Sequence, residues 1–93
     1  MLLPSVLDFN KPYCGEKLAD LCVAIGLDED ADLGTAVTNL RTTLGLPATL
    51  SEMGVPQTLI DPVSHAAVID HSNASNPKTL KSSEYAEIMR MAF

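Results

Sequence analysis

Apolar residues in the first half of the chain recur every three or four positions, which is the repeat of an amphipathic helix. One such stripe consists of Leu18, Leu21, Cys22 and Ile25, and a second consists of Leu33, Val37, Leu40 and Leu44. Each stripe is followed by a Gly-Leu pair, at Gly26-Leu27 and at Gly45-Leu46. Glycine readily takes the left-handed backbone that ends a helix, and the next Leu packs back onto the last turn. We therefore predict two consecutive helices that end at these glycines.

Two further helices are predicted in the middle of the chain. Thr49 and Glu52 have the spacing of a capping box and precede a stop at Gly54-Val55, so we expect one short helix here. At Asp61-Pro62 the aspartate fits the N-cap and the proline fits the first helical position. The inner face of that helix is predicted to consist of Val63, Ala66 and Ala67.

A polar segment from His71 to Lys78 separates these elements from a last helix. Asn76 precedes Pro77 and is therefore disfavoured in helical geometry, so a loop is expected. Ser82 or Ser83 is predicted to cap the last helix, with Glu84 in its first turn. Its expected inner face is Tyr85, Ile88 and Met89, extending to Phe93.

The chain begins in apolar sequence, Met1-Leu2-Leu3-Pro4, with no capping residue ahead of it. Two interpretations stay open: a chain cut from a longer one, or a native start followed by a short helix with Pro4 in its first position. No segment shows the sustained alternation of a strand. We predict an all-α fold in which residues 1–93 form one helical domain, an irregular bundle of about five to six short helices.

Composition and charge narrow the function. The 93 residues are 46% hydrophobic and include two Phe, two Tyr and no Trp, which suits one domain with an aliphatic core. Twelve acidic residues against six basic ones give a net charge of -6, the wrong sign for binding nucleic acid or an anionic membrane. No apolar run approaches the roughly 20 residues of a membrane span, and no signal peptide is evident. We expect a soluble cytoplasmic protein.

Several candidate metal or catalytic sites lack the residue types or the spacing that such sites require. Cys14 and Cys22 are read as reduced thiols, with a disulfide or half of a metal site as the alternative. The acids at Asp28, Asp30 and Asp32 lack the Gly and Glu of a calcium loop and are better explained as the capped start of a helix. His65 is expected at the surface, and six residues separate it from His71, which is no metal-binding spacing. The chain also lacks the glycine-rich nucleotide, GxSxG and HExxH motifs.

Asp70 stands out because it continues the inner face of its helix at the C-terminal end, where the helix dipole disfavours a negative charge. Two interpretations are open. Asp70 caps the following loop by accepting from the amide of Ser72 or Asn73. Alternatively, Asp70, His71 and Ser72 line the wall of a cleft formed with another domain.

Three segments together resemble the C-terminal part of iron-containing (group III) alcohol dehydrogenases. They are Leu2-Leu3-Pro4-x-Val6-Leu7-x-Phe9-Asn10, then Leu44-Gly45-Leu46-Pro47-Ala48-Thr49-Leu50 with Ser51-Glu52-Met53-Gly54-Val55, and then Asp70 followed after five residues by Asn76-Pro77, with Phe93 at the end. The resemblance covers nearly the whole chain in order. Ser5, where members often carry His, and Lys78, where they usually carry Arg, depart from it.

The resemblance implies a two-domain enzyme in which a metal, iron or sometimes zinc, polarises an alcohol or carbonyl oxygen while hydride passes to or from NAD(P). The metal's one Asp and three His and the glycine-rich turn would lie upstream, so this chain is expected to hold no metal or cofactor and to be inactive alone. Its expected partners are the N-terminal dinucleotide-binding domain and, through an exposed apolar face, other copies of itself. The rival hypothesis is a self-contained acidic helical module that binds a partner protein.

Overall fold

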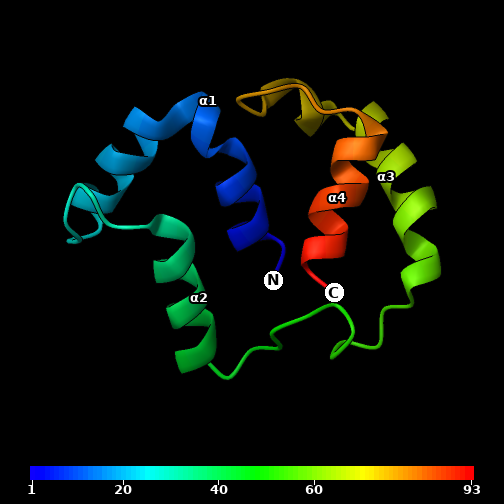
Figure 1. Ribbon diagram of the computed structural model, residues 1–93, viewed down its shortest axis with the longest axis horizontal. Coiled ribbons are helices and arrows are strands. Elements are labelled where there is room, and N and C mark those ends of the chain that lie inside the picture. The colour runs from blue at the N-terminus through cyan, green and yellow to red at the C-terminus, as the bar shows by residue number, and fades with distance from the viewer.

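The computed structural model describes residues 1–93 and contains helices but no strands, which confirms the all-α prediction. Its four α-helices are α1 (Leu3–Ala24), α2 (Leu33–Thr43), α3 (Ile60–Ile69) and α4 (Ser82–Met91). Two short 3₁₀ helices, η1 (Gln57–Leu59) and η2 (His71–Ser75), bring the number of helical segments close to that predicted. Helices α1 and α2 form one side of the molecule, α3 and α4 form the other, and both chain ends lie between them (Figure 1).

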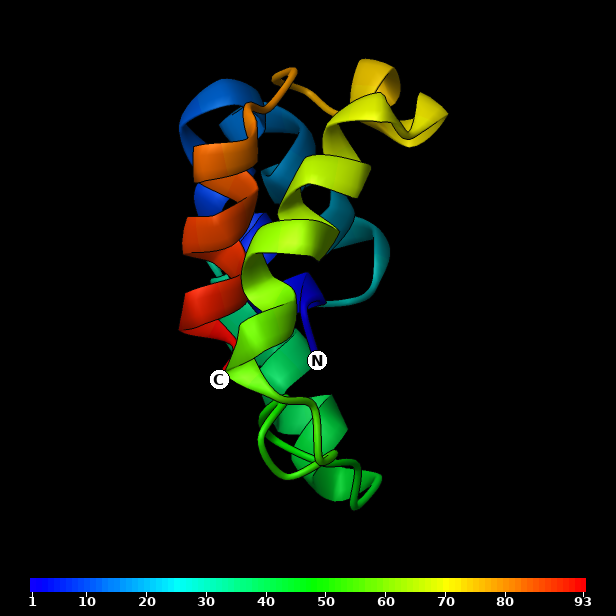
Figure 2. The same ribbon diagram turned by 90° about the vertical axis from the view of Figure 1, so that its right-hand side faces the viewer.

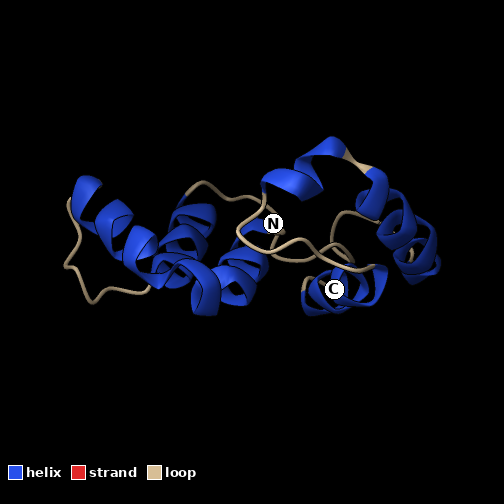
Figure 3. Ribbon diagram, turned by 90° about the horizontal axis from the view of Figure 1, so that it is seen from above, coloured by secondary structure: helices blue, strands red, loops and turns tan.

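The molecule is flat, with extents of 39 × 31 × 17 Å, and the two helix pairs lie side by side when it is viewed from above (Figure 3). Helices α3 and α4 run antiparallel and adjacent to each other, as both Figure 1 and Figure 2 show. The long segment between α2 and α3 crosses from one pair to the other. No helix is both long enough and apolar enough to cross a membrane.

Helix α1 is bent in its middle. Pro12 lies inside the helix, where it has no N–H to donate, and Cys14 takes a non-helical backbone conformation (φ -148°, ψ 30°). The Cys14 thiol lies 3.3 Å from the carbonyl oxygen of Asn10 and donates to it. A single bent helix thus joins the apolar start of the chain to the Leu18–Ile25 stripe. Both cysteines are free thiols, and Cys22 is buried, as predicted.

The two predicted Gly-Leu helix stops are confirmed. Gly26 has a φ of +83°, and the amide of Leu27 donates to the carbonyl of Cys22 at 2.9 Å. Gly45 has a φ of +66°, and the amide of Leu46 donates to the carbonyl of Arg41 at 3.1 Å. Both endings satisfy carbonyls that a helix otherwise leaves free.

The hydrophobic core lies between α3 and α4. It is a cluster of Leu50, Ile60, Ala86, Met89 and Ala92, against which Met1, Val55 and Phe93 pack. The segment before α3 also contacts the C-terminus, because the amide of Leu50 donates to the carbonyl of Ala92 at 2.8 Å. This half of the molecule therefore has its own core, which Met1 at the start of the chain also contacts.

The predicted inner face of α3 is wrong. Val63 and Ala66 are exposed, and the buried positions of the helix are Ile60 and Ser64. Ser64 is only 1% exposed, and its hydroxyl lies 3.7 Å from the sulfur of Met89 on α4. A small side chain here lets the two helices approach closely, which hydrophobicity alone does not reveal.

Two of the predicted middle elements also differ from the structure. The segment after Thr49 forms turns and no helix, although the amide of Glu52 does donate to Thr49 Oγ1 at 3.2 Å. Its Leu50 amide is instead engaged with the C-terminus. Asp61 is not an N-cap, because η1 runs directly into α3 and places Asp61 inside the first turn.

The start of α4 is capped by a different residue from the two predicted. Lys81 occupies the N-cap position in place of Ser82 or Ser83. The carboxylate of Glu84 accepts from the Lys81 amide at 2.9 Å, so a side chain of the first turn satisfies the free N–H. Glu84 does lie in the first turn, as expected, and Ile88 and Met89 are buried.

The predicted apolar stripes lie along α1 and α2 and their C-caps, and half of the stripe residues are exposed. Cys22 is buried, whereas Ile25, Leu40 and Leu44 are 61%, 57% and 62% exposed. These large side chains follow a helical repeat and yet face solvent. The α1–α2 pair thus covers its apolar faces only in part, since Leu18, Leu33 and Val37 are half-buried and the remaining large apolar side chains of the stripes are exposed.

Candidate functional site: the connection between α3 and α4

Asp70 leaves α3 and opens the connection to α4. Its backbone is extended (φ -67°, ψ 137°), and its Oδ1 accepts from the amide of Ser72 at 2.8 Å. This bond lowers the pKa of the Asp70 carboxyl below its ordinary value. The predicted cap on the Ser72 amide is confirmed, and the aspartate lies at the start of η2, where a negative charge is favourable.

Beside Asp70 the surface is hollowed over a volume of about 430 Å³. Asp70 and Ser72 line this hollow together with Val63, Ala66, Ala67, Asn73, Asn76 and Tyr85. His71 does not, since its side chain is 97% exposed and its Nδ1 lies 3.7 Å from Asp70 Oδ1. The structure thus brings Asp70 and Ser72 together in the hollow and leaves His71 outside it. We name this feature the α3–α4 hollow.

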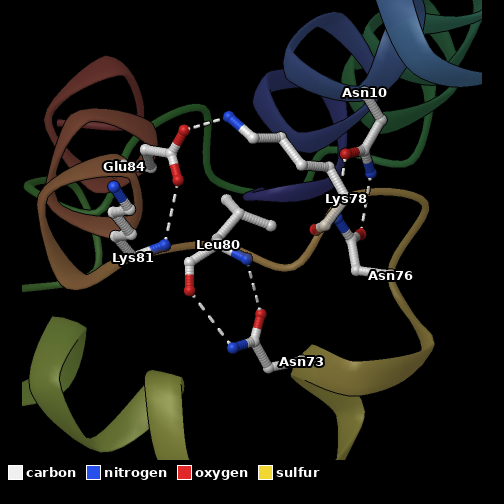
Figure 4. A network of polar contacts seen from close by, with 7 residues as sticks. All are labelled: Asn10, Asn73, Asn76, Lys78, Leu80, Lys81 and Glu84. Atoms are coloured by element: carbon white, nitrogen blue, oxygen red, sulfur yellow. Dashed lines mark hydrogen bonds and ion pairs between the residues drawn. The ribbon is translucent and has the colours of Figure 1, made fainter.

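The buried amide of Asn73 holds the connection in place (Figure 4). Its oxygen accepts from the Leu80 amide and from the Tyr85 hydroxyl, both at 2.9 Å. Its nitrogen donates to the carbonyls of Val68, at 3.1 Å, and Leu80, at 3.2 Å. All four hydrogen bonds that an Asn side chain can make are formed. Sequence reasoning missed this residue, because a polar residue in a polar segment gives no sign of being buried.

A second pair of amides ties the connection to α1. Asn10 Nδ2 donates to Asn76 Oδ1 at 2.8 Å, and Asn76 Nδ2 donates back to Asn10 Oδ1 at 3.0 Å. Asn76 Nδ2 also donates to the carbonyl of Lys78 at 2.7 Å. Both asparagines occur in the segments that resemble the dehydrogenase family, but spacing along the chain could not predict that they pair.

The side chain of Lys78 contacts both α1 and α4. Its ammonium donates to Glu84 and lies 5.5 Å from the ring centre of Phe9 and 5.2 Å from that of Tyr13. The hydrogen bond between Lys78 and Glu84 raises the pKa of the lysine and lowers that of the glutamate. The second Glu84 oxygen accepts from the Lys81 amide. A bidentate Arg would need both oxygens, so a Lys at this position suits the one that is free.

Tyr85 contributes a phenol to the hollow. Burial, followed by the negative charge of Asp70, raises the pKa of this phenol above its ordinary value. The hydroxyl therefore keeps its proton and donates it to Asn73.

The donor atoms of the chain do not fit a divalent metal. No three His, Cys, Asp or Glu side chains lie close enough to share an ion. The chain has only two histidines, of which His65 bonds through Nδ1 to the carbonyl of Asp61 at 2.8 Å and His71 extends into solvent. A metal held by three His ligands therefore cannot be bound by this chain's residues alone.

Asp32, the last of the acids before α2, caps that helix. Asp32 accepts from the amide of Thr35 at 2.8 Å and from the Lys11 ammonium at 3.0 Å. The Thr35 amide first, and then Lys11, lower the pKa of Asp32 to about 2. Gly34 is buried where α1 and α2 meet, and a Cβ at this position would lie 2.8 Å from Asp8 Oδ1. Within the acidic run, the capping interpretation is therefore confirmed for Asp32.

The whole chain is similar in sequence to known proteins. Residues 1–93 match the model of the Fe-containing alcohol dehydrogenase family, C-terminal. The chain is 31% identical to a 4-hydroxybutyrate dehydrogenase of Cupriavidus necator, with 99% of this chain aligned to 25% of that protein. It is 32% identical to a 1,3-propanediol dehydrogenase of Citrobacter freundii, with 100% of this chain aligned to 26% of that protein. The chain thus spans about a quarter of the length of these relatives. None of the solved structures gives a significant match.

Proposed function

Because the chain belongs to the iron-containing alcohol dehydrogenase family, as its C-terminal helical portion, we propose that it works as part of an NAD(P)-linked dehydrogenase. That enzyme interconverts an alcohol and the corresponding aldehyde or ketone. The observation that carries the proposal is the match of residues 1–93, the whole of this chain, to the family's C-terminal model. Iron or zinc and the nucleotide would be held by the portion of the enzyme that this chain does not contain.

The contribution of this chain is one wall of the substrate cleft, formed by the connection from Asp70 to Asn76. Asp70 and Ser72 line the α3–α4 hollow, so substrate atoms could reach both side chains. His71 extends away from the chain's own surface, in a position to contact a neighbouring domain. The polar network around Asn73 and Asn76 supports this role, because it fixes the backbone that carries the wall.

The exposed apolar stripes of α1 and α2 fit a surface covered by the remaining part of the enzyme. Large apolar side chains such as Ile25, Leu40 and Leu44 are seldom left in solvent along a whole helix face. We expect the dinucleotide-binding portion to cover them. Without that portion the chain should self-associate in the cytoplasm.

The names of the relatives indicate the size of the substrate. One acts on 4-hydroxybutyrate, a hydroxy acid, and another on 1,3-propanediol, a diol. Both are short aliphatic alcohols with a second polar group at the far end. We propose a substrate of this type for the enzyme to which this chain contributes.

A chimera tests the proposal. The aligned C-terminal quarter of the Citrobacter freundii 1,3-propanediol dehydrogenase is replaced by this chain, and NAD(P)-linked oxidation of 1,3-propanediol is measured with iron bound. Turnover is expected, and Asp70→Ala and Ser72→Ala should change kcat/KM, whereas Glu87→Ala, on an exposed part of α4, should not. The chain alone, loaded with iron or zinc, should give no turnover.

The same experiment addresses the rival hypothesis of a self-contained interaction module. A chimera that folds and binds nucleotide but shows no turnover would favour the module. Turnover by the isolated 93-residue chain would contradict the claim that it depends on the rest of the enzyme.

A further inference from the structure

The α3–α4 hollow combines an apolar side with a polar side. Val63, Ala66 and Ala67 on α3 supply the aliphatic part, while Asp70, Ser72 and Tyr85 supply polar atoms. A pocket of this kind fits a short aliphatic chain that ends in one polar group. The hydrogen-bonding groups that remain free decide which polar group it accepts.

The amide donors in the hollow are already used. Both N–H bonds of Asn73 are donated to the carbonyls of Val68 and Leu80. Those of Asn76 are donated to Asn10 and to the carbonyl of Lys78. The Tyr85 hydroxyl donates its single proton to Asn73. None of these three side chains has a proton left for a ligand.

The acceptors, in contrast, are partly free. Asp70 uses Oδ1 for the Ser72 amide and has Oδ2 available. Tyr85 Oη donates but receives no hydrogen bond in the structure, so its lone pairs are available. The Ser72 hydroxyl, which makes no hydrogen bond within the chain, is the only free side-chain donor in the hollow. The side chains of the hollow therefore offer one donor and several acceptors, one of which carries a negative charge.

We infer that the α3–α4 hollow receives a hydrogen-bond-donating group, a hydroxyl or an ammonium, at the end of a short aliphatic chain, and disfavours a carboxylate. This inference rests on the proposed function, in which it selects diols and amino alcohols over hydroxy acids as the substrate class. The physical reason is that a carboxylate can only accept hydrogen bonds and would face the Asp70 carboxylate. A hydroxyl or ammonium donates to Asp70 Oδ2 or to Tyr85 Oη.

Three probes with the same number of carbons test the inference on the 93-residue chain: 3-amino-1-propanol, 1,3-propanediol and 3-hydroxypropanoate. Each is titrated at about pH 7, where the amine and the acid are charged, and binding is followed through the amide NMR signals of residues that line the hollow. We expect the amino alcohol to bind about fivefold more tightly than the acid, which is the upper end for an exposed charge pair. The diol should lie between them.

Asp70→Asn is the decisive variant, because Asn retains the oxygen that accepts from the Ser72 amide but removes the charge. It should bring the ratio of the amino alcohol and acid affinities close to one. Glu87→Gln removes a charge from an exposed position of α4 and should leave the ratio unchanged. Should Asp70→Asn disturb the fold, raising the salt to about 1 M with the unaltered chain should also bring the ratio toward one.

Equal or tighter binding of the acid, or no perturbation of the hollow's signals by any probe, would overturn the inference. A ratio that persists in a folded Asp70→Asn variant would do the same. These results are distinct from a failure of the proposed function, which concerns turnover by the chimera. An active chimera whose hollow prefers the acid would retain the function and reject the substrate class.

Discussion

The two halves of the molecule are held together in different ways. The α3–α4 half buries an aliphatic cluster that includes Ile60 and Met89, and Leu50 closes its lower end against the C-terminus. The α1–α2 half buries small or polar residues such as Cys22 and Gly34, whereas Leu40 and Leu44 face solvent. The contacts between α1 and the start of α2 include the Lys11–Asp32 ion pair.

The difference indicates where the stability of the chain resides. Buried apolar area is the main favourable term in folding, so the α3–α4 half has a source of stability of its own. The α1–α2 half has helix-forming sequence without a matching core. Its exposed stripes are the surface that, in the function proposed above, the dinucleotide-binding portion would cover. Substitutions in each half, and at the link between them, should therefore differ in their effect on unfolding.

The largest effect is expected in the core. Ile60→Ala removes a buried side chain of the α3–α4 cluster and should lower the free energy of unfolding by about 2–5 kcal/mol. Leu40→Ala, a comparable truncation at an exposed position of α2, should change it by less than about 0.5 kcal/mol. Denaturant unfolding of both variants measures the difference. Similar losses in the two variants would contradict the contrast.

The next largest loss of stability is expected from removal of the buried Asn73 amide in the α3–α4 connection. Asn73→Ala leaves the Leu80 amide and the Tyr85 hydroxyl without their acceptor and two carbonyls without their donor. The expected loss is about 1–3 kcal/mol, because buried polar groups lose their partners. Asn39→Ala, at an exposed position of α2, is the matched control and should be near neutral. A neutral Asn73→Ala would show that these four hydrogen bonds do not stabilise the connection.

The hydrogen bonds that join the two halves should contribute less to stability than the Asn73 network. Asn10 and Asn76 exchange two hydrogen bonds across 66 residues of sequence. A double-mutant cycle with both residues changed to Ala should give a coupling energy of about 1 kcal/mol. Thermal or denaturant unfolding of the four proteins measures this energy. Additive single effects would mean that the halves fold without this link.

The smallest expected effect is the loss of stability at low pH that arises from Asp32. The pKa of Asp32 falls from 3.8 to about 2 in the folded chain, so its charged form stabilises the fold above about pH 4 and that stability is lost as the pH falls toward 2. Its side chain is 42% exposed, so solvent screening should keep the contribution below about 1 kcal/mol. Asp32→Asn keeps an oxygen for the Thr35 amide but does not titrate. The difference in stability between the two proteins should shrink with acid; a constant difference would contradict the assignment.

Whether the sequence could predict a feature depends on how far apart along the chain the interacting residues lie. The stops at Gly26 and Gly45 and the caps at Asp32 and Asp70 depend on residues a few positions away, so the sequence predicts them. The inner face of α3 depends on Ser64 meeting Met89, 25 residues later, and was mispredicted. The same applies to the segment after Thr49, whose backbone pairs with the C-terminus.

The residues of the candidate site likewise fall into those that the sequence predicts and those that it does not. The sequence singled out Asp70 and Ser72, which line the hollow, because an aspartate at a helix end requires a partner. It did not single out Asn73 or Tyr85 for the site, since their burial depends on how α4 packs against the connection. It also could not show that His71 extends into solvent.

The proposal that α1 and α2 depend on a further portion of an enzyme is tested most directly by amide hydrogen exchange, measured residue by residue on the isolated chain and on the same chain within the chimera. We predict that α3 and α4 are protected in both proteins, whereas α1 and α2 exchange quickly in the isolated chain and become protected in the chimera. Equal protection of α1 and α2 in the two proteins would contradict the claim that the rest of the enzyme covers their apolar faces.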